Sequence, residues 1–159
     1  MPGRRLDAAR RAAYSVFFLG LSPLAPGTVA SAAAAAAILF LLPREGASYA
    51  LAVLSVAAAA FLASVALGAS AERIEDKKDP SAFVLDEVAG QAITLLSLSA
   101  PGPGDVLFGF VAFRLFDIVK PFPARRLEGA RGGWGIALDD AVAGIYANVA
   151  LHLWRAVAG

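Results

Sequence analysis

Long apolar runs, separated by short polar segments, dominate the chain. The clearest run covers residues 47–71, with no charge between Glu45 and Glu72. A helix of this length exceeds the roughly 20 apolar residues that a transmembrane span needs. Further apolar stretches predict helices over residues 29–42, 83–99, 105–119 and 135–157. The pattern therefore predicts an all-α fold, an integral membrane bundle of about five helices.

Clusters of glycine and proline separate the predicted helices. The segment GLSPLAPGT at residues 20–28 holds two prolines and two glycines, so it predicts a loop. Thr28 is placed to cap the helix that follows. That helix, over residues 29–42, is short for a span, and its small residues favour close packing. Other breaks are expected at residues 43–46, in the polar loop 72–82, at 100–104 and in the basic loop that begins with Pro121 and Pro123.

The N-terminal residues 5–19 form an amphipathic pattern with two interpretations. In the first, an interfacial helix turns its arginines toward lipid phosphates, while Tyr14, Phe17 and Phe18 face acyl chains. In the second, the segment is an ordinary helix that flanks the bundle. The pattern favours the two equally. Because no long apolar core and cleavage site follow, we do not expect a cleaved signal.

Composition supports a membrane protein and excludes several kinds of site. Hydrophobic residues make up 58% of the 159 residues, with a mean hydropathy of +0.66, against about 45–50% in soluble domains. We expect one domain over residues 1–159. The absence of cysteine excludes disulfides and a thiol nucleophile, and the single histidine, His152, excludes a histidine-rich metal site. A net charge of +1 indicates no nucleic-acid partner, and nothing indicates an oligomeric state.

The positive charges predict how the chain is oriented. Eleven of the fourteen Lys and Arg lie within residues 4–11, 73–78 and 120–131. Cytoplasmic segments of membrane proteins are enriched in these residues. Five spans alternating from a cytoplasmic N-terminus put all three stretches on the cytoplasmic side, with only Arg44 and Arg155 outside. The expected partners are the membrane and its anionic phospholipids.

This topology brings acidic residues from three helices to one level at the cytoplasmic side. Helices 83–99 and 135–157 begin there, helix 105–119 ends there, and the loop 20–28 lies there too. The converging acids are Asp86, Glu87, Asp117, Asp139 and Asp140. A single acid in a first helical turn is explained by the helix dipole, but five together are costly in an apolar protein and need cations.

Two basic side chains and a divalent ion could balance these acids. Arg114 and Lys120 lie beside them in sequence, and Arg114 shares a helix face with Asp117 at a spacing of three. All-oxygen ligation favours Mg²⁺, with Mn²⁺ and Ca²⁺ as alternatives. Neighbouring acids point about 100° apart, so we favour one ligand from each adjacent pair. Gly90 and Gly144, each four residues after an acid, favour close helix contacts.

Two other classes of function are weighed against metal-dependent chemistry. Carboxylates and an arginine within a bundle also occur in ion or proton transporters. A transport path would have to continue through polar residues, and these are sparse: Ser97, Ser99, Asp105, Asn148 and His152. The third hypothesis is a lipid-binding scaffold without catalysis, which would not need so many acids.

Four segments of the chain are distinctive: GLSPLAPGTVAS (20–31), DPSAFVLDEVAGQAIT (79–94), FRLFDIVKPFPARRLE (113–128) and GGWGIALDDAVAGIYAN (132–148). Together, and in this order, they resemble the phosphatidylglycerophosphatase A family. The resemblance implies a bacterial inner-membrane enzyme that uses Mg²⁺ to remove the terminal phosphate of phosphatidylglycerophosphate, leaving phosphatidylglycerol. One departure is that FLGLSP keeps only Gly20 of the GSG that the family often has.

The resemblance also adds Asp79 to the acids of the site. We expect the metal to be held by a set of acids, and the phosphate to be clamped by Arg114 and Lys120. Asp117 or Asp139 would orient the attacking water or act as general base, and an aspartyl-phosphate route stays open. Backbone N–H groups around Gly27 and the Thr28 hydroxyl would also contact the phosphate. The expected metal ligands are Asp79, Asp86, Glu87 and Asp140.

Overall fold

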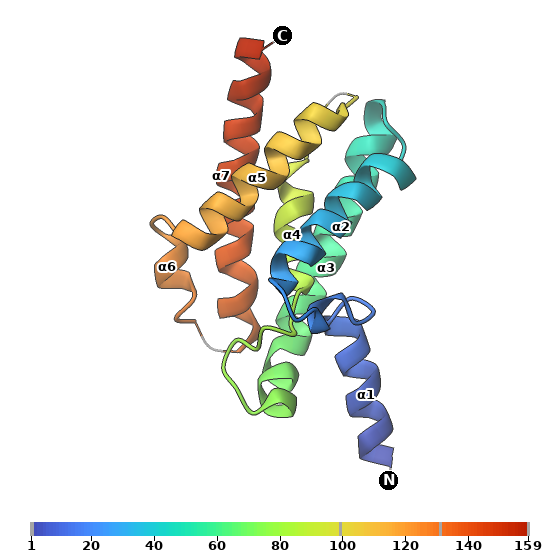
Figure 1. The fold of residues 1–159 in the computed structure, drawn as a ribbon, viewed down its shortest axis with the longest axis vertical. Coiled ribbons are helices and arrows are strands. Elements are labelled where there is room, and N and C mark those ends of the chain that lie inside the picture. Colours follow the sequence, from blue (N-terminus) through green and yellow to red (C-terminus); the bar gives the residue numbers. More distant parts are fainter. Residues whose placement is uncertain (1, 99, 131, 159) are drawn as a thin grey trace.

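The protein is described by a computed structural model that covers residues 2–98, 100–130 and 132–158 (Figure 1). Ser99 and Arg131, which the sequence analysis named, lie outside this part. Within it, every regular element is a helix, which confirms the all-α prediction. The elements are α1 (Pro2–Tyr14), the 3₁₀ helix η1 (Leu19–Leu21), α2 (Pro26–Leu41), α3 (Gly46–Glu75), α4 (Leu85–Thr94), α5 (Pro103–Val119), α6 (Ala124–Leu127) and α7 (Gly133–Ala158).

Two helical segments lie where loops were expected. The long helix α3 continues to Glu75, four residues into the predicted loop 72–82. Its last turn is held from α1, because Arg11 Nε lies 2.9 Å from Glu75 Oε1. The short helix α6 lies within the predicted basic loop after Pro123. Its first residue, Ala124, is fully buried, which fixes this turn against the protein.

Helix α4 is much shorter than predicted and ends inside the protein. It stops at Thr94 after 10 residues, or about 15 Å, so the expected helix over 83–99 is wrong. Side chains from other helices take the place of its next backbone donors. Asn148 Nδ2 donates to the carbonyls of Thr94 and Leu96, both at 2.9 Å. The Tyr49 hydroxyl donates to the Leu95 carbonyl at 2.9 Å.

Small residues let α4 and α7 pack at short range. A Cβ atom on Gly144 would lie only 3.1 Å from Cα of Gly90, and a Cβ on Gly90 would lie 2.8 Å from the Asp140 carbonyl. Both approaches are closer than ordinary side-chain packing permits, which confirms the predicted role of this glycine pair. Helix α4 also packs against α2, α3 and α5, so it lies at the centre of the fold (Figure 1).

Helix α1 is anchored to the rest of the protein through its last residue, Tyr14. It ends at Tyr14, not at residue 19, and the expectation that Tyr14 faces acyl chains is wrong. Tyr14 is fully buried, stacks on Phe83 with ring centroids 5.5 Å apart, and donates a 2.5 Å hydrogen bond to Glu75. Phe17 is 87% exposed, so its ring is free to meet lipid as expected.

The outer surface is rich in apolar side chains. Helices α3 and α7, of 30 and 26 residues, are long and apolar enough to cross a membrane, and α2 is apolar but shorter. At 10 residues, α4 is too short for the span expected of it. The large apolar residues that lie exposed include Phe40, Leu54, Leu62, Leu107, Ile118, Val149 and Leu153.

Candidate active site

A cavity of about 270 Å³ gathers the acids that the sequence analysis predicted to converge. It lies where α2, α4 and α7 begin and α5 ends. Thr28 is the one predicted site residue that does not line it. The lining residues are Ala25, Pro26, Gly27, Asp79, Pro80, Ser81, Phe83, Asp86, Glu87, Arg114, Asp117, Lys120, Asp139 and Asp140.

The helix ends explain this convergence. Asp86 and Glu87 occupy the first turn of α4, and Asp139 and Asp140 occupy the second turn of α7. The close contact between α4 and α7 lies one turn further along each helix and brings these two acid pairs together. Helix α5 runs in the opposite direction and brings its last turns to the same place.

Three carboxylates surround one point in the cavity. Asp86, Glu87 and Asp140 each offer an oxygen, and these three oxygens lie within 4.8 Å of one another. Asp86 and Asp140 are only 7% and 4% exposed. On α7, Asp139 is bound to Lys120 instead of joining this group. On α4, the longer side chain of Glu87 reaches the same point as Asp86, so both members of that pair belong to the group.

These carboxylates are suited to bind a divalent metal, because each has an oxygen atom without a hydrogen-bond partner in the described chain. Asp86 Oδ1, Glu87 Oε2 and Asp140 Oδ2 are buried without a hydrogen-bond partner among the described residues. Burying such groups unpaired is expensive. A hard divalent ion prefers oxygen ligands and would satisfy all three. Asp79 lines the same cavity, as the resemblance implied, but it is not part of this group of three.

Arg114 is positioned to bind an anion beside this cluster. Its Nη1 atom lies 2.7 Å from Asp117 Oδ2, which confirms the predicted pairing along one helix face. Both Nη1 and Nε are nevertheless buried without a hydrogen-bond partner in the described chain. The ion pair therefore holds the guanidinium in place while leaving donors for another anion.

Lys120 is bound to acids and is not a free cation. Its Nζ atom lies 2.7 Å from Asp139 Oδ2 and 3.2 Å from Glu128 Oε1. Burial lowers the pKa of Lys120, but its hydrogen bonds and charge interactions with Asp139 and Glu128 outweigh this effect and raise the pKa. The sequence analysis did not include Glu128 in the site, although it ends the segment that also carries Lys120.

Gly27 allows α2 to approach the acids closely. A Cβ atom here would overlap Oε1 of Glu87 and lie 3.3 Å from Nη1 of Arg114. The prediction that Thr28 caps α2 is wrong, because Ala25 precedes the helix and Pro26 begins it, a position that proline favours. The first backbone N–H groups of α2 therefore lie at the cavity, without intrahelical partners.

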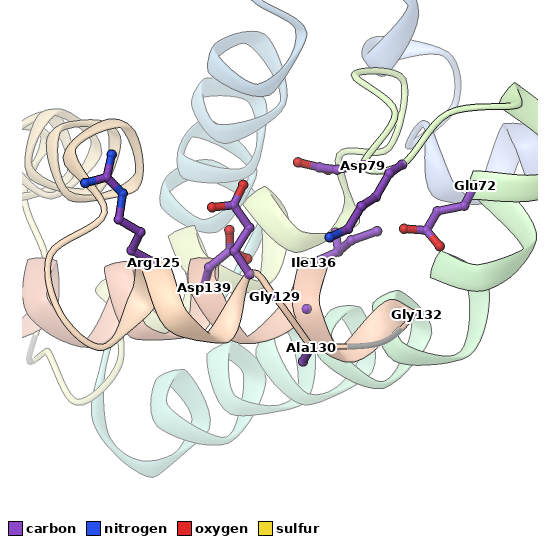
Figure 2. A pocket seen from close by; sticks show the side chains of 11 residues that line it. Glu72, Asp79, Arg125, Gly129, Ala130, Gly132, Ile136 and Asp139 are labelled. Atoms are coloured by element: carbon purple, nitrogen blue, oxygen red, sulfur yellow. The ribbon is translucent and has the colours of Figure 1, made fainter.

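A larger cavity of about 470 Å³ adjoins the first and was not predicted (Figure 2). Asp79 and Asp139 contribute to the walls of both cavities. Glu72 of α3 and Arg125 of α6 also line the larger one (Figure 2). The polar surface beside the acidic cavity therefore continues toward α6.

Gln91 is a further polar residue that the sequence analysis missed. It is fully buried, and neither atom of its side-chain amide has a hydrogen-bond partner within the described residues. It lies one helical turn after Glu87, on α4. A polar residue four positions after an acid, in an otherwise apolar stretch, was the signal that could have found it.

Comparison with known proteins places the chain in a family. A sequence profile of phosphatidylglycerophosphatase A matches residues 12–155. The chain belongs to the phosphatidylglycerophosphatase A family. This confirms the resemblance and the expectation of a lipid phosphatase. No solved structure matches the chain.

Three relatives of the chain carry phosphatase names. A putative phosphatidylinositol-3-phosphatase of Bacteroides thetaiotaomicron is 36% identical over 154 residues, covering 90% of this chain and 91% of the relative. Phosphatidylglycerophosphatase A of Escherichia coli is 36% identical over 132 residues, covering 81% and 73%. Phosphatidylglycerophosphatase A of Haemophilus influenzae is 39% identical over 80 residues, covering 48% and 49%.

Proposed function

We propose that this protein is a Mg²⁺-dependent phosphatase that hydrolyses phosphatidylglycerophosphate to phosphatidylglycerol and inorganic phosphate. The observation that carries the proposal is the cluster of Asp86, Glu87 and Asp140 oxygens within 4.8 Å of one another, in one cavity with the Arg114 guanidinium. Such a site binds a phosphate group through a divalent ion and a cation together.

The three clustered carboxylates would hold the ion, with Asp79 nearby in the cavity wall. When bound, Mg²⁺ supplies charge that stabilises the phosphate oxygens during displacement. Arg114 binds these oxygens with the N–H groups that Asp117 leaves free. The N-terminus of α2 adds unpaired backbone donors and the positive end of its dipole. Thr28 contributes through this first turn, since its side chain does not line the cavity.

Asp139 is the residue that we assign to the attacking water. Its Oδ2 atom is fixed by Lys120 at 2.7 Å, while its Oδ1 atom is buried without a hydrogen-bond partner in the described chain. A carboxylate held in this way can orient a water molecule and accept its proton. Lys120 then acts by positioning Asp139, and Asp117 acts by positioning Arg114.

We further propose that the protein is embedded in the bacterial inner membrane and that its site opens to the cytoplasm. The long apolar helices α3 and α7 and the exposed apolar side chains support the embedding. The basic segments α1 and the one after α3 lie toward one end of the molecule, and the basic helix α6 lies at mid-height beside α7 (Figure 1). Their excess of positive charge supports a cytoplasmic orientation for that end.

Transport is less well supported than hydrolysis. Beyond the acids, the interior holds a cluster of buried apolar residues that includes Leu95, Leu98 and Leu151. Asn148 is occupied in holding the end of α4. Gln91 and Thr94 are the buried polar side chains of α4 beyond the acids, and they are followed by the apolar cluster, which supports hydrolysis over a continuous proton or ion path.

The experiment is phosphate release by the purified protein in detergent, with Mg²⁺ and then with EDTA. Phosphatidylglycerophosphate is the first substrate. Phosphatidylinositol 3-phosphate is the second, because one relative bears the name of an inositol-lipid phosphatase. We expect release from the first that stops with EDTA. Phosphate release from the inositol lipid alone would mean that the inositol lipid is the substrate. If the folded protein released phosphate from neither lipid, the proposal would be refuted.

A further inference from the structure

An apolar groove of about 280 Å³ separates α2 from α5 on the outer surface. Every residue that lines it is apolar. Small side chains of α2, such as Ala32 and Ala36, leave the space, and larger ones of α5, such as Leu107 and Phe110, form the opposite wall. Ala32 and Ala36 are exposed, and Leu107 is 63% exposed, so the groove is open along its side.

The wall formed by α5 leads directly into the acidic cavity. Pro103, Leu107, Phe110, Arg114 and Asp117 follow one another at spacings of four, three, four and three residues. Residues at these spacings lie on one face of a helix. The first three line the groove and the last two line the acidic cavity. This face therefore changes from apolar to charged within one helical turn.

The wall formed by α2 leads to the same place. Ala32 and Ala36 continue, at spacings of four, the face on which Thr28 lies, within the first turn of α2. The residue before Thr28, Gly27, lines the acidic cavity, and a Cβ atom on it would lie 3.3 Å from Nη1 of Arg114. Gly27 of α2 and Arg114 of α5 thus bring the two helices that enclose the groove together at the cavity where the phosphate would bind.

We propose that this groove holds an acyl chain of the phospholipid whose terminal phosphate enters the acidic cavity. The inference rests on the proposed lipid phosphatase function. A phospholipid of this kind has a charged end and a long apolar end. The acidic cavity suits the charged end, and the adjoining groove suits the apolar end. The groove runs about 10 Å along α5 between Pro103 and Phe110, which is long enough for the first part of a chain.

The groove aligns the lipid and adds little to its affinity for the membrane. An acyl chain that leaves the bilayer for the groove exchanges one apolar surrounding for another, so the hydrophobic gain is small. Holding the chain fixes the angle at which the phosphate meets the acids, and such orientation acts on the rate. Filling the groove should therefore lower kcat/KM for a long-chain lipid by about tenfold while leaving membrane insertion unchanged.

The test compares Ala36→Phe, which fills the groove, with Ala58→Phe as matched control. Ala58 is an exposed alanine of α3 that does not line the groove. Each protein is assayed with Mg²⁺ on phosphatidylglycerophosphate that carries either two sixteen-carbon or two six-carbon chains. We expect Ala36→Phe to lose about tenfold on the long-chain lipid and less than about twofold on the short-chain one. The control should match the wild type on both.

Three results would overturn the inference. Equal losses on the two lipids would mean that Ala36→Phe disturbs the spacing of α2 and α5. Equal behaviour of Ala36→Phe and Ala58→Phe would mean that no chain lies in the groove. A further variant, Ala37→Phe, fills a second apolar cavity of about 300 Å³ on another face of α2. A chain-length effect seen only with that variant would place the acyl chain in the second cavity. If the wild type releases no phosphate from either lipid, the proposed function fails instead.

Discussion

Replacing Gly27 with alanine should inactivate the site without unfolding the protein. The new Cβ would overlap Oε1 of Glu87, one of the three clustered carboxylates, and crowd the Arg114 guanidinium at 3.3 Å. The atom that must move is the end of a flexible side chain, so the backbone can stay in place. Alanine is also favoured over glycine inside a helix by about 1 kcal/mol. The net change in stability should therefore stay within about 1 kcal/mol.

The change in activity should be far larger than the change in stability. Moving the Glu87 carboxylate removes one proposed metal ligand and disturbs the anion-binding donors beside it. Losses of this kind commonly cost a factor of about 100 in rate or metal affinity. We expect kcat/KM for phosphatidylglycerophosphate to fall at least that far, and the Mg²⁺ concentration for half-maximal rate to rise. Phosphate release across a Mg²⁺ titration measures both quantities.

The chain offers a matched control for this substitution. Gly104 follows Pro103 at the start of α5, as Gly27 follows Pro26 at the start of α2. A Cβ on Gly104 would meet no atom within 4 Å, so Gly104→Ala should keep full activity. Gly27→Ala with normal turnover and normal Mg²⁺ dependence would refute the placement of Glu87. Unfolding of Gly27→Ala would refute the claim that only a side chain must move.

Three other substitutions distinguish residues that matter for turnover from residues that matter for stability. Asp140→Asn should lower turnover by about 100-fold or more while leaving the thermal midpoint equal or higher, because it removes charge from an overcrowded cluster; a lower midpoint would contradict this. Lys120→Met should lose both activity and stability, by about 3 kcal/mol or more, because it leaves the buried Asp139 unpaired; unchanged thermal unfolding would show that the pair is unimportant. Asn148→Leu should cost about 1–3 kcal/mol in unfolding, because the carbonyls of Thr94 and Leu96 lose their donor; a wild-type midpoint would mean that these carbonyls find other partners.

The acid site was predictable because helix order and charge distribution together determine which helix ends share a level. Asp86 and Asp140 lie far apart in sequence, yet both begin helices that start on the same side. The cavity that contains both confirms this inference. It needed only apolar periodicity and the positions of lysine and arginine, which are local properties of the sequence.

The features that could not be predicted depend on contacts between distant side chains. Apolar periodicity continues past Thr94, but α4 stops there because Asn148 and Tyr49 bind the carbonyls that follow. Tyr14 belongs to an amphipathic pattern, but Glu75 and Phe83 draw it inward. In each case, contacts with residues from distant parts of the sequence outweigh the local preference. The pattern within a single segment cannot predict which distant residues make these contacts.

The charge balance of the cavity leads to a last prediction. Six of its lining residues are acidic and two are basic. Lys120 is already bound to Asp139 and Glu128, and Arg114 to Asp117. Among the described residues, Asp86, Glu87 and Asp140 form no ion pair with a basic side chain, so a bound divalent ion should stabilise the folded protein as well as support the reaction.

Thermal unfolding in detergent tests this coupling without measuring activity. An ion that binds only the folded state adds about 2.7 kcal/mol of stability at one hundred times its Kd. Mg²⁺ should therefore raise the thermal midpoint of the wild type, and K⁺ at equal ionic strength should not. Asp140→Asn should respond less, since it removes a ligand, and Gly104→Ala should respond fully. If Mg²⁺ raised the thermal midpoint of the wild type and of Asp140→Asn equally, the ion would be acting at another place. If K⁺ raised the midpoint as much as Mg²⁺ does, the effect would be general screening of charge.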